Sequence, residues 1–184
     1  FVSALLVLLL SVSSIAAMYL LGQKYVAAAF FQKGITAFNE RGDLNTARDN
    51  IVTAINLDGQ DHYFRSLAET DLLRMNELLG RQDISPDELR SSFQTALGQA
   101  IQSGQRATEL NPVEPLNWIA LGRIYEAVIP FRIEGAAAFA SDMYDRAHMR
   151  DPQIPEPLFF RAGANTQACY IGDALALLEQ ANVI

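Results

Sequence analysis

One spacing of residues recurs along this chain and restricts its fold more than any other feature. Each copy has an alanine, a larger or variable residue four positions later, and a second alanine three positions after that. A turn-forming glycine or proline follows five residues later in the first three copies. Positions three and four apart share one face of a helix, and small residues there let a neighbouring helix approach closely. The copies are Ala47-Ile51-Ala54-Gly59, Ala100-Gly104-Ala107-Pro112, Ala140-Tyr144-Ala147-Pro152 and Ala174-Leu178-Ala181.

The copies follow one another at intervals that shrink along the chain. Equivalent alanines are separated by 53 residues from Ala54 to Ala107, by 40 from there to Ala147, and by 34 from there to Ala181. Self-similarity at such periods indicates a repeat architecture, in which each unit buries its apolar face against its neighbours. Relative to the last interval, we expect insertions of 19 and 6 residues between the two helices of the second and third repeats.

A second pattern identifies the repeat type. Trp118, Leu121, Gly122 and Tyr125 reproduce the W-x2-L-G-x2-Y pattern of tetratricopeptide repeats. The alanine spacing matches that family's A-x3-F-x2-A-x4-P pattern, with Tyr144 in place of phenylalanine in the third copy. The chain resembles the tetratricopeptide repeat family. The resemblance implies an all-α fold, a solenoid of about four helical hairpins near residues 23–59, 60–112, 113–152 and 153–184.

The expected helix boundaries follow from residues that interrupt or cap helices. Five of the seven prolines fall between the repeats. Ser85, Pro86 and Glu88 have the order expected of a helix cap, first turn and capping carboxylate. We predict almost no strand. The predicted first helices lie near residues 23–40, 62–79, 115–128 and 156–169, and the second helices near 44–57, 86–110, 136–150 and 172–182. The helix at 86–110 is long because the larger insertion extends its hairpin.

The first 21 residues carry no charge. About 20 apolar residues at a rise of about 1.5 Å each match a hydrocarbon core about 30 Å thick, so we predict a transmembrane helix over residues 1–22. A secretory signal sequence and a buried core helix remain alternatives. The chain starts at Phe1 without an initiator methionine, and its last repeat ends near Ala181 without a capping helix. We therefore expect that the protein continues beyond both ends.

All charged residues follow this apolar segment, and the net charge is −7. An acidic surface disfavours nucleic acid, so the expected partners are a protein or peptide and, through residues 1–22, the lipid bilayer. The predicted location is a membrane, the inner membrane if the source is bacterial. Lys24, Lys33 and Arg41 favour a cytoplasmic domain by the positive-inside rule, but the side of the membrane stays open without the upstream flank. The single cysteine, Cys169, does not fix the compartment.

The sequence contains few candidate catalytic or metal-binding residues. His62 and His148 have no cysteine or carboxylate at ligand spacing, and Cys169 has no basic neighbour in sequence to lower its pKa. Acidic pairs such as Asp142 with Asp145 fit exposed helix faces, and no phosphate-binding loop or nucleophile motif is present. We therefore predict no catalytic residue, no metal site and no cofactor, and expect that this segment is not an enzyme.

The family resemblance does imply a binding surface. Tetratricopeptide repeats usually bind peptides on the concave face formed by the first helix of each hairpin. The carboxylate-clamp subtype uses lysine and asparagine at such positions, whereas this chain has Ile119 and Arg123, which argues against capture of an acidic peptide terminus. The predicted concave-face residues are Arg65, Glu69, Ile119, Arg123, Phe159 and Gly163.

Three functions remain open from the sequence. The first is a membrane-tethered scaffold that mediates protein–protein interaction. The second is the non-catalytic tail of a glycan-transferring membrane enzyme, because the segments KYVAAAFFQKGITAFNERGDLNTARDNIVTAINLD, RATELNP and NWIALGRIYE resemble the C-terminal repeats of bacterial polytopic O-antigen-ligase-type proteins. The third is a structural spacer without a peptide ligand.

Overall fold

The structure is a computed structural model that describes residues 2–168 and 177–182. Every regular element in those ranges is a helix, so the predicted all-α class is confirmed. The chain divides into two compact units, Phe1–Gly59 and Gln60–Ile184.

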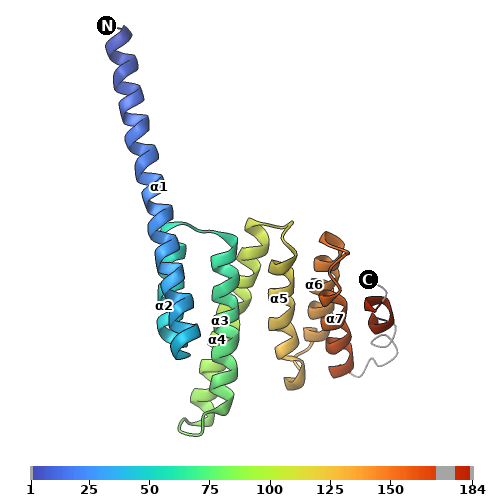
Figure 1. Cartoon of the computed structure of the whole chain (residues 1–184). Coiled ribbons are helices and arrows are strands. Elements are labelled where there is room, and N and C mark those ends of the chain that lie inside the picture. The colour runs from blue at the N-terminus through green and yellow to red at the C-terminus, as the bar shows by residue number, and fades with distance from the viewer. Residues whose placement is uncertain (1, 169–176, 183–184) are drawn as a thin grey trace. The chain divides into compact units, whose positions relative to one another are not determined.

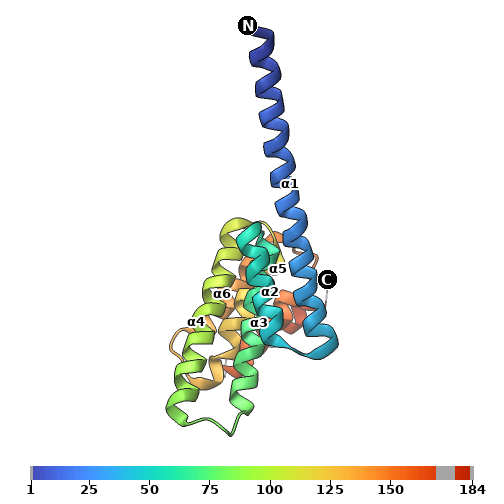
Figure 2. The ribbon, with the colours of Figure 1, turned by 90° about the vertical axis from the view of Figure 1, so that its left-hand side faces the viewer.

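The first unit is one helical hairpin. Its helices are α1, Val2–Arg41, and α2, Leu44–Leu57, which lie side by side in Figures 1 and 2. Gly42 makes the turn with a φ of 64°, a conformation open to glycine, and Asp43 caps α2 by accepting a hydrogen bond from Thr46 N at 3.0 Å. Close packing needs Gly34, because a Cβ atom there would lie 2.9 Å from the Ala47 carbonyl oxygen.

The apolar segment and the first helix of this hairpin form one continuous helix. The apolar part of α1 extends beyond α2 (Figure 1), and its large side chains are exposed at Leu10, Ile15 and Met18. By length and composition Leu9–Arg41 can cross a membrane, with a mean hydropathy of 1.2. A signal sequence and a core helix pass the same test, so it establishes only that α1 suits a span.

The second unit begins with a long hairpin, α3, Asp61–Gly80, and α4, Pro86–Leu110. The observed α4 has the predicted bounds. The predicted cap is also present, because the Ser85 hydroxyl accepts a hydrogen bond from Glu88 N at 3.2 Å. The tip of this hairpin extends past α5 in Figure 1, as expected of an insertion between its helices.

The remaining described elements follow the repeat order. They are α5, Pro115–Ala127, the 3-10 turn η1, Ile129–Phe131, α6, Ala136–Arg150, α7, Glu156–Gln167, and a short helix at 177–181. The last packs Leu177 and Ala181 on Leu158 and Ala162 of α7. The predicted helix at 172–182 is described only in this part, and Cys169 and Ala174 lie outside the described residues.

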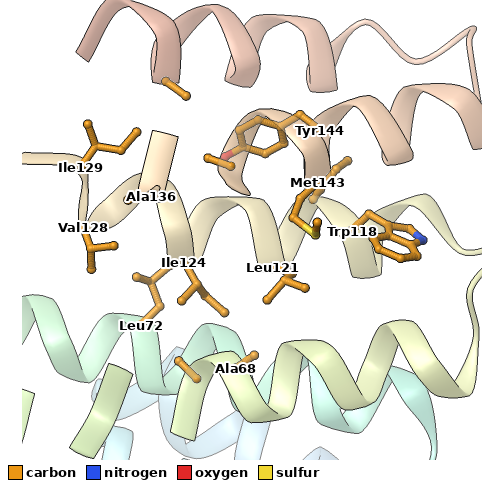
Figure 3. Close-up of a cluster of buried hydrophobic side chains, with 14 of the residues drawn as sticks. Ala68, Leu72, Trp118, Leu121, Ile124, Val128, Ile129, Ala136, Met143 and Tyr144 are labelled. Carbon is orange, nitrogen blue, oxygen red and sulfur yellow. The ribbon is translucent and has the colours of Figure 1, made fainter. Parts of the chain in front are cut away.

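The core of the second unit explains the repeat motif. Trp118, Leu121 and Tyr144 are buried in one cluster between α4, α5 and α6 (Figure 3). The Tyr144 ring covers Gly122 so closely that a Cβ atom there would lie 2.5 Å from ring carbon Cε1. Gly104 is similarly close to Leu121, since a Cβ atom there would lie 3.0 Å from Cδ1. The motif residues therefore specify the approach of neighbouring helices.

Candidate functional site

A cavity of about 600 Å³ opens on the second unit, and we call it the groove. One face of each of α3, α5 and α7 lines it, together with the segment between α6 and α7. The contributing side chains recur at three- or four-residue steps along each helix, as residues on one helical face must. The lining residues are Arg65, Glu69, Leu116, Ile119, Arg123, Gln153, Ile154, Pro155, Glu156 and Phe160.

The floor of the groove is apolar. Ile119 is 8% exposed and belongs to the core, whereas Leu116, three residues earlier, is 48% exposed. Phe160 is half-buried and stacks on Tyr144, with ring centroids 5.6 Å apart. The groove thus continues outward from the hydrophobic core and leaves Leu116 available for contact with a ligand.

A buried amide fixes one wall. The Arg65 Nη1 atom donates to Asn117 Oδ1 at 2.9 Å, and Asn117 is fully buried. In turn, Asn117 Nδ2 lies 2.9 Å from Asp61 Oδ2 and 3.1 Å from the Ala107 carbonyl oxygen. These contacts join the start of α3, the end of α4 and the start of α5. Arg65 is therefore held in place on the wall of the groove.

The carboxylate of this network stays ionised. Partial burial alone raises the pKa of Asp61, but hydrogen bonds from Asn117, Asn111 and the His62 backbone, together with the His62 ring, hold this pKa below its usual value. The Asn111 amide nitrogen lies 3.2 Å from Asp61 Oδ2. A negative charge thus sits behind the Arg65–Asn117 pair, which reduces the attraction of Arg65 for an anionic ligand.

The α5 face of the groove carries a second cation. Arg123 is exposed, and among the described residues no hydrogen bond or ion pair holds its guanidinium group. One helical turn away, the Glu126 carboxylate accepts hydrogen bonds from the Tyr144 hydroxyl and, at 3.2 Å, from Gln167 Nε2. Burial raises the pKa of Glu126 above its usual value, although Tyr144 and Arg123 act in the opposite direction. Glu126 thereby joins α5, α6 and α7 beside the groove.

Four of the six predicted concave-face residues lie together in the groove: Arg65, Glu69, Ile119 and Arg123. The two predicted on α7, Phe159 and Gly163, are not among the lining residues. Phe159 is 41% exposed outside the lining set, and a Cβ atom on Gly163 would lie 3.2 Å from Glu126 Oε1. Phe160 and Glu156 line the groove from α7 in their place.

Sequence reasoning missed this wall because α7 lacks the tryptophan, leucine, glycine and tyrosine that fix the register of α5. A shift of one residue turns a helix position by about 100°, which moves it to another face. Leu116 could have been found from its three-residue spacing to Ile119. Nothing in the sequence marks Gln153, Ile154 and Pro155 as lining residues, because they come from a connecting segment.

The described residues offer no positive evidence of catalysis. Across 2–168 and 177–182, no three histidine, cysteine, aspartate or glutamate side chains gather closely enough to hold a metal ion. His62 lies in the first turn of α3 with its ring 4.2 Å from that of Tyr63, and His148 lies on α6. Among its described lining residues the groove has no histidine or cysteine.

No family model and no curated protein matches this sequence. Among solved structures, a crystal structure of MamA has a TM-score of 0.62 at 18% identity, covering 84% of this chain and 75% of that one. A second MamA structure has a TM-score of 0.42 at 17% identity, covering 85% of this chain and 90% of that one. The complex of the yeast Sti1 TPR2AB domain with pHSP90 has a TM-score of 0.42 at 15% identity, covering 86% and 62%. MamA contains tetratricopeptide repeats, and the match extends over most of both chains. The chain therefore has the fold of a tetratricopeptide repeat protein.

Proposed function

We propose that this chain is a membrane-tethered scaffold that binds a segment of a partner protein in the groove. The groove is the observation that supports this proposal, because α3, α5 and α7, the first helices of three hairpins, present an open apolar surface bordered by charged side chains. A concave site of several hundred Å³ with an apolar floor and a limited number of polar side chains around it is typical of ligand-binding sites. The apolar α1 supports the tether.

The lining residues define the chemistry of the bound segment. Arg65 and Arg123 balance Glu69 and Glu156, so the groove carries no net charge although the chain carries −7. Its floor is formed by Leu116, Ile119 and Phe160. We therefore expect a segment with apolar side chains that contact the floor and with neutral or mixed-charge flanks, rather than a free carboxyl terminus.

A matched pair of variants tests the groove. Leu116→Ser with Arg123→Glu changes two exposed groove residues, and we expect the partner's affinity for the full chain to fall at least tenfold, about 1.4 kcal/mol. Leu110→Ser with Arg106→Glu makes the same chemical changes on α4, outside the groove, where Leu110 is 40% and the Arg106 side chain 51% exposed.

Titration of the detergent-solubilised full chain with the partner, by fluorescence anisotropy, measures both variants. The control pair should leave the affinity unchanged. If both pairs weaken binding equally, or neither does, then the groove is not the binding site.

A further inference from the structure

The single helix α1 carries both the apolar segment and the packing face of the first hairpin. Leu20 and Leu21 are 58% and 67% exposed, whereas Ala27 is fully buried against the rest of the hairpin. Ala27 lies only six positions after Leu21. At about 1.5 Å per residue, the hairpin begins about 9 Å beyond the apolar segment. That distance is smaller than the thickness of a helix with its side chains.

The antiparallel packing of α2 determines which part of the hairpin lies nearest this segment. Gly34 marks the register, since a Cβ atom there would lie 2.9 Å from Ala47 O and 3.1 Å from Ile51 Cγ1. Ala27 lies seven residues before Gly34 on α1. Because the two helices are antiparallel, the same step from Ala47 and Ile51 toward the C-terminus of α2 reaches residues 54–58. The C-terminal end of α2 is therefore level with Ala27, and the turn at Gly42 is at the far end.

The α1 side chains that precede this level suit a lipid headgroup layer. Tyr19 and Tyr25 are 65% and 79% exposed, and Gln23 Nε2 lies 3.1 Å from the Tyr19 hydroxyl oxygen. Lys24 is the first charged residue of the chain. Tyrosine favours the membrane interface, and a lysine ammonium group is attracted to headgroup phosphates.

Serine hydroxyl groups in the apolar segment form hydrogen bonds within the helix. The Ser13 and Ser14 hydroxyls donate to the Leu9 and Leu10 carbonyl oxygens at 2.7 and 2.8 Å. Their donors are thus satisfied within the helix, as a hydrocarbon environment requires. With α1 spanning a bilayer, the end of the uncharged segment at Leu21 and the charge of Lys24 would put the boundary between hydrocarbon and headgroups between these two residues.

We propose that the first hairpin stands directly on the lipid headgroups, with the C-terminal end of α2 in contact with them and the turn at Gly42 pointing away. This inference rests on the proposed membrane span. The unbroken α1 acts as a rigid mount that fixes the height and tilt of the hairpin. A flexible tether would fix neither of these.

Fluorescence quenching in phosphatidylcholine vesicles tests the proposal on the full chain. In a Cys169→Ser background, single-cysteine variants carry a bimane label at Ile15, at Asn56 near the end of α2, or at Glu40 near the turn, all exposed positions. Lipids with a nitroxide on the headgroup or on the acyl chain serve as quenchers. By helical rise, the Glu40 label lies about 20 Å farther from the membrane than the Asn56 label.

We expect acyl-chain nitroxides to quench the Ile15 label, and headgroup nitroxides to quench Asn56 at least about twice as strongly as Glu40, given that height difference. Equal quenching of Asn56 and Glu40, or none at either, with Ile15 still quenched, would overturn the mount but leave the span intact. An unquenched Ile15 label would contradict the span itself, and with it the mount and the membrane tether, but not binding in the groove.

A second variant tests the rigidity. A Gly-Ser-Gly-Ser insertion between Gly22 and Gln23 interrupts α1 and should reduce headgroup quenching of the Asn56 label without changing that of Ile15. If Asn56 remains fully quenched, the unbroken helix does not set the position of the hairpin, and the mount is wrong.

Discussion

At the scale of single residues, the packing of Tyr144 on Gly122 is the closest approach that the repeat motif specifies. A methyl group on Gly122 would collide with ring carbons at 2.5 and 2.8 Å, and Tyr144 is fully buried and cannot move aside easily. We expect Gly122→Ala to destabilise the second unit by about 1–3 kcal/mol, the usual cost of overpacking a core. Urea unfolding of the full chain in detergent, followed by Trp118 fluorescence, measures this loss, since Trp118 is the only tryptophan.

Gly98→Ala is the matched control. Gly98 lies within α4, and a Cβ atom there would meet nothing within 4 Å. Alanine favours a helix interior over glycine by about 0.5–1 kcal/mol, so this variant should be more stable than the wild type. Destabilisation by both variants, or by neither, would contradict the role given to the Tyr144–Gly122 contact.

The Glu126 carboxyl provides a prediction about pH. Because burial raises its pKa in the folded state, the folded protein binds this proton more tightly than the unfolded chain does. The stability that Glu126 contributes is thus fully present below its unfolded pKa and is lost as the pH rises through its folded pKa. Glu126→Gln removes this loss while its amide oxygen can still accept from Tyr144. The variant should be more stable than the wild type at pH 7, by a margin that shrinks toward pH 4.

Urea midpoints from Trp118 fluorescence at both pH values provide the comparison. A margin that is constant across the range would show that the pKa of Glu126 is the same in the folded and unfolded states, contrary to the effect of its burial.

At the scale of the elements, the cap of α4 controls the tip of the long hairpin. Ser85→Ala removes the acceptor for Glu88 N, and a lost N-cap costs about 0.5–2 kcal/mol. The loss should appear as faster amide hydrogen exchange in the first turns of α4. Ser91→Ala, an exposed change inside the same helix, should slow exchange slightly, because alanine is the better helix former. Equal exchange in the two variants would show that the cap does not hold this end.

The elements themselves could largely be predicted from the sequence, because local signals mark their ends. Pro86 and Pro115 start helices, Gly42 ends one, and the alanine spacing gives their packing faces. Four groove residues followed from this register. The α7 wall did not, because no motif fixes the rotation of that helix. The hydrogen bonds of Asn117 were also unpredictable, since they join residues up to 56 positions apart.

At the scale of the whole molecule, the proposed tether depends on α1 crossing a bilayer. We expect the full chain to remain with membranes after extraction with alkaline carbonate, since an uncharged, predominantly apolar segment of about 20 residues favours the hydrocarbon core. A variant in which Leu10, Ile15 and Met18 are replaced by aspartate should be released, because each buried charge costs about 2.5–3.5 kcal/mol. Release of the unaltered chain would refute the span.

The alternative role as the tail of a glycan-transferring membrane enzyme stays a prediction of the sequence resemblance. The complete reading frame decides it, because that role requires several further apolar spans and a catalytic domain upstream of Phe1. The groove and the mount would then serve that enzyme as an accessory binding arm.

Site-specific photo-crosslinking in living cells tests the central claim, binding of a partner protein in the groove, most directly. A benzophenone amino acid replaces Leu116 in the groove or Gln94 on the exposed surface of α4, each in the full chain. We predict a discrete crosslinked protein from position 116 that is absent from position 94 and is lost on adding Arg123→Glu. The same adducts from both positions, or an adduct from position 94 alone, would contradict binding in the groove.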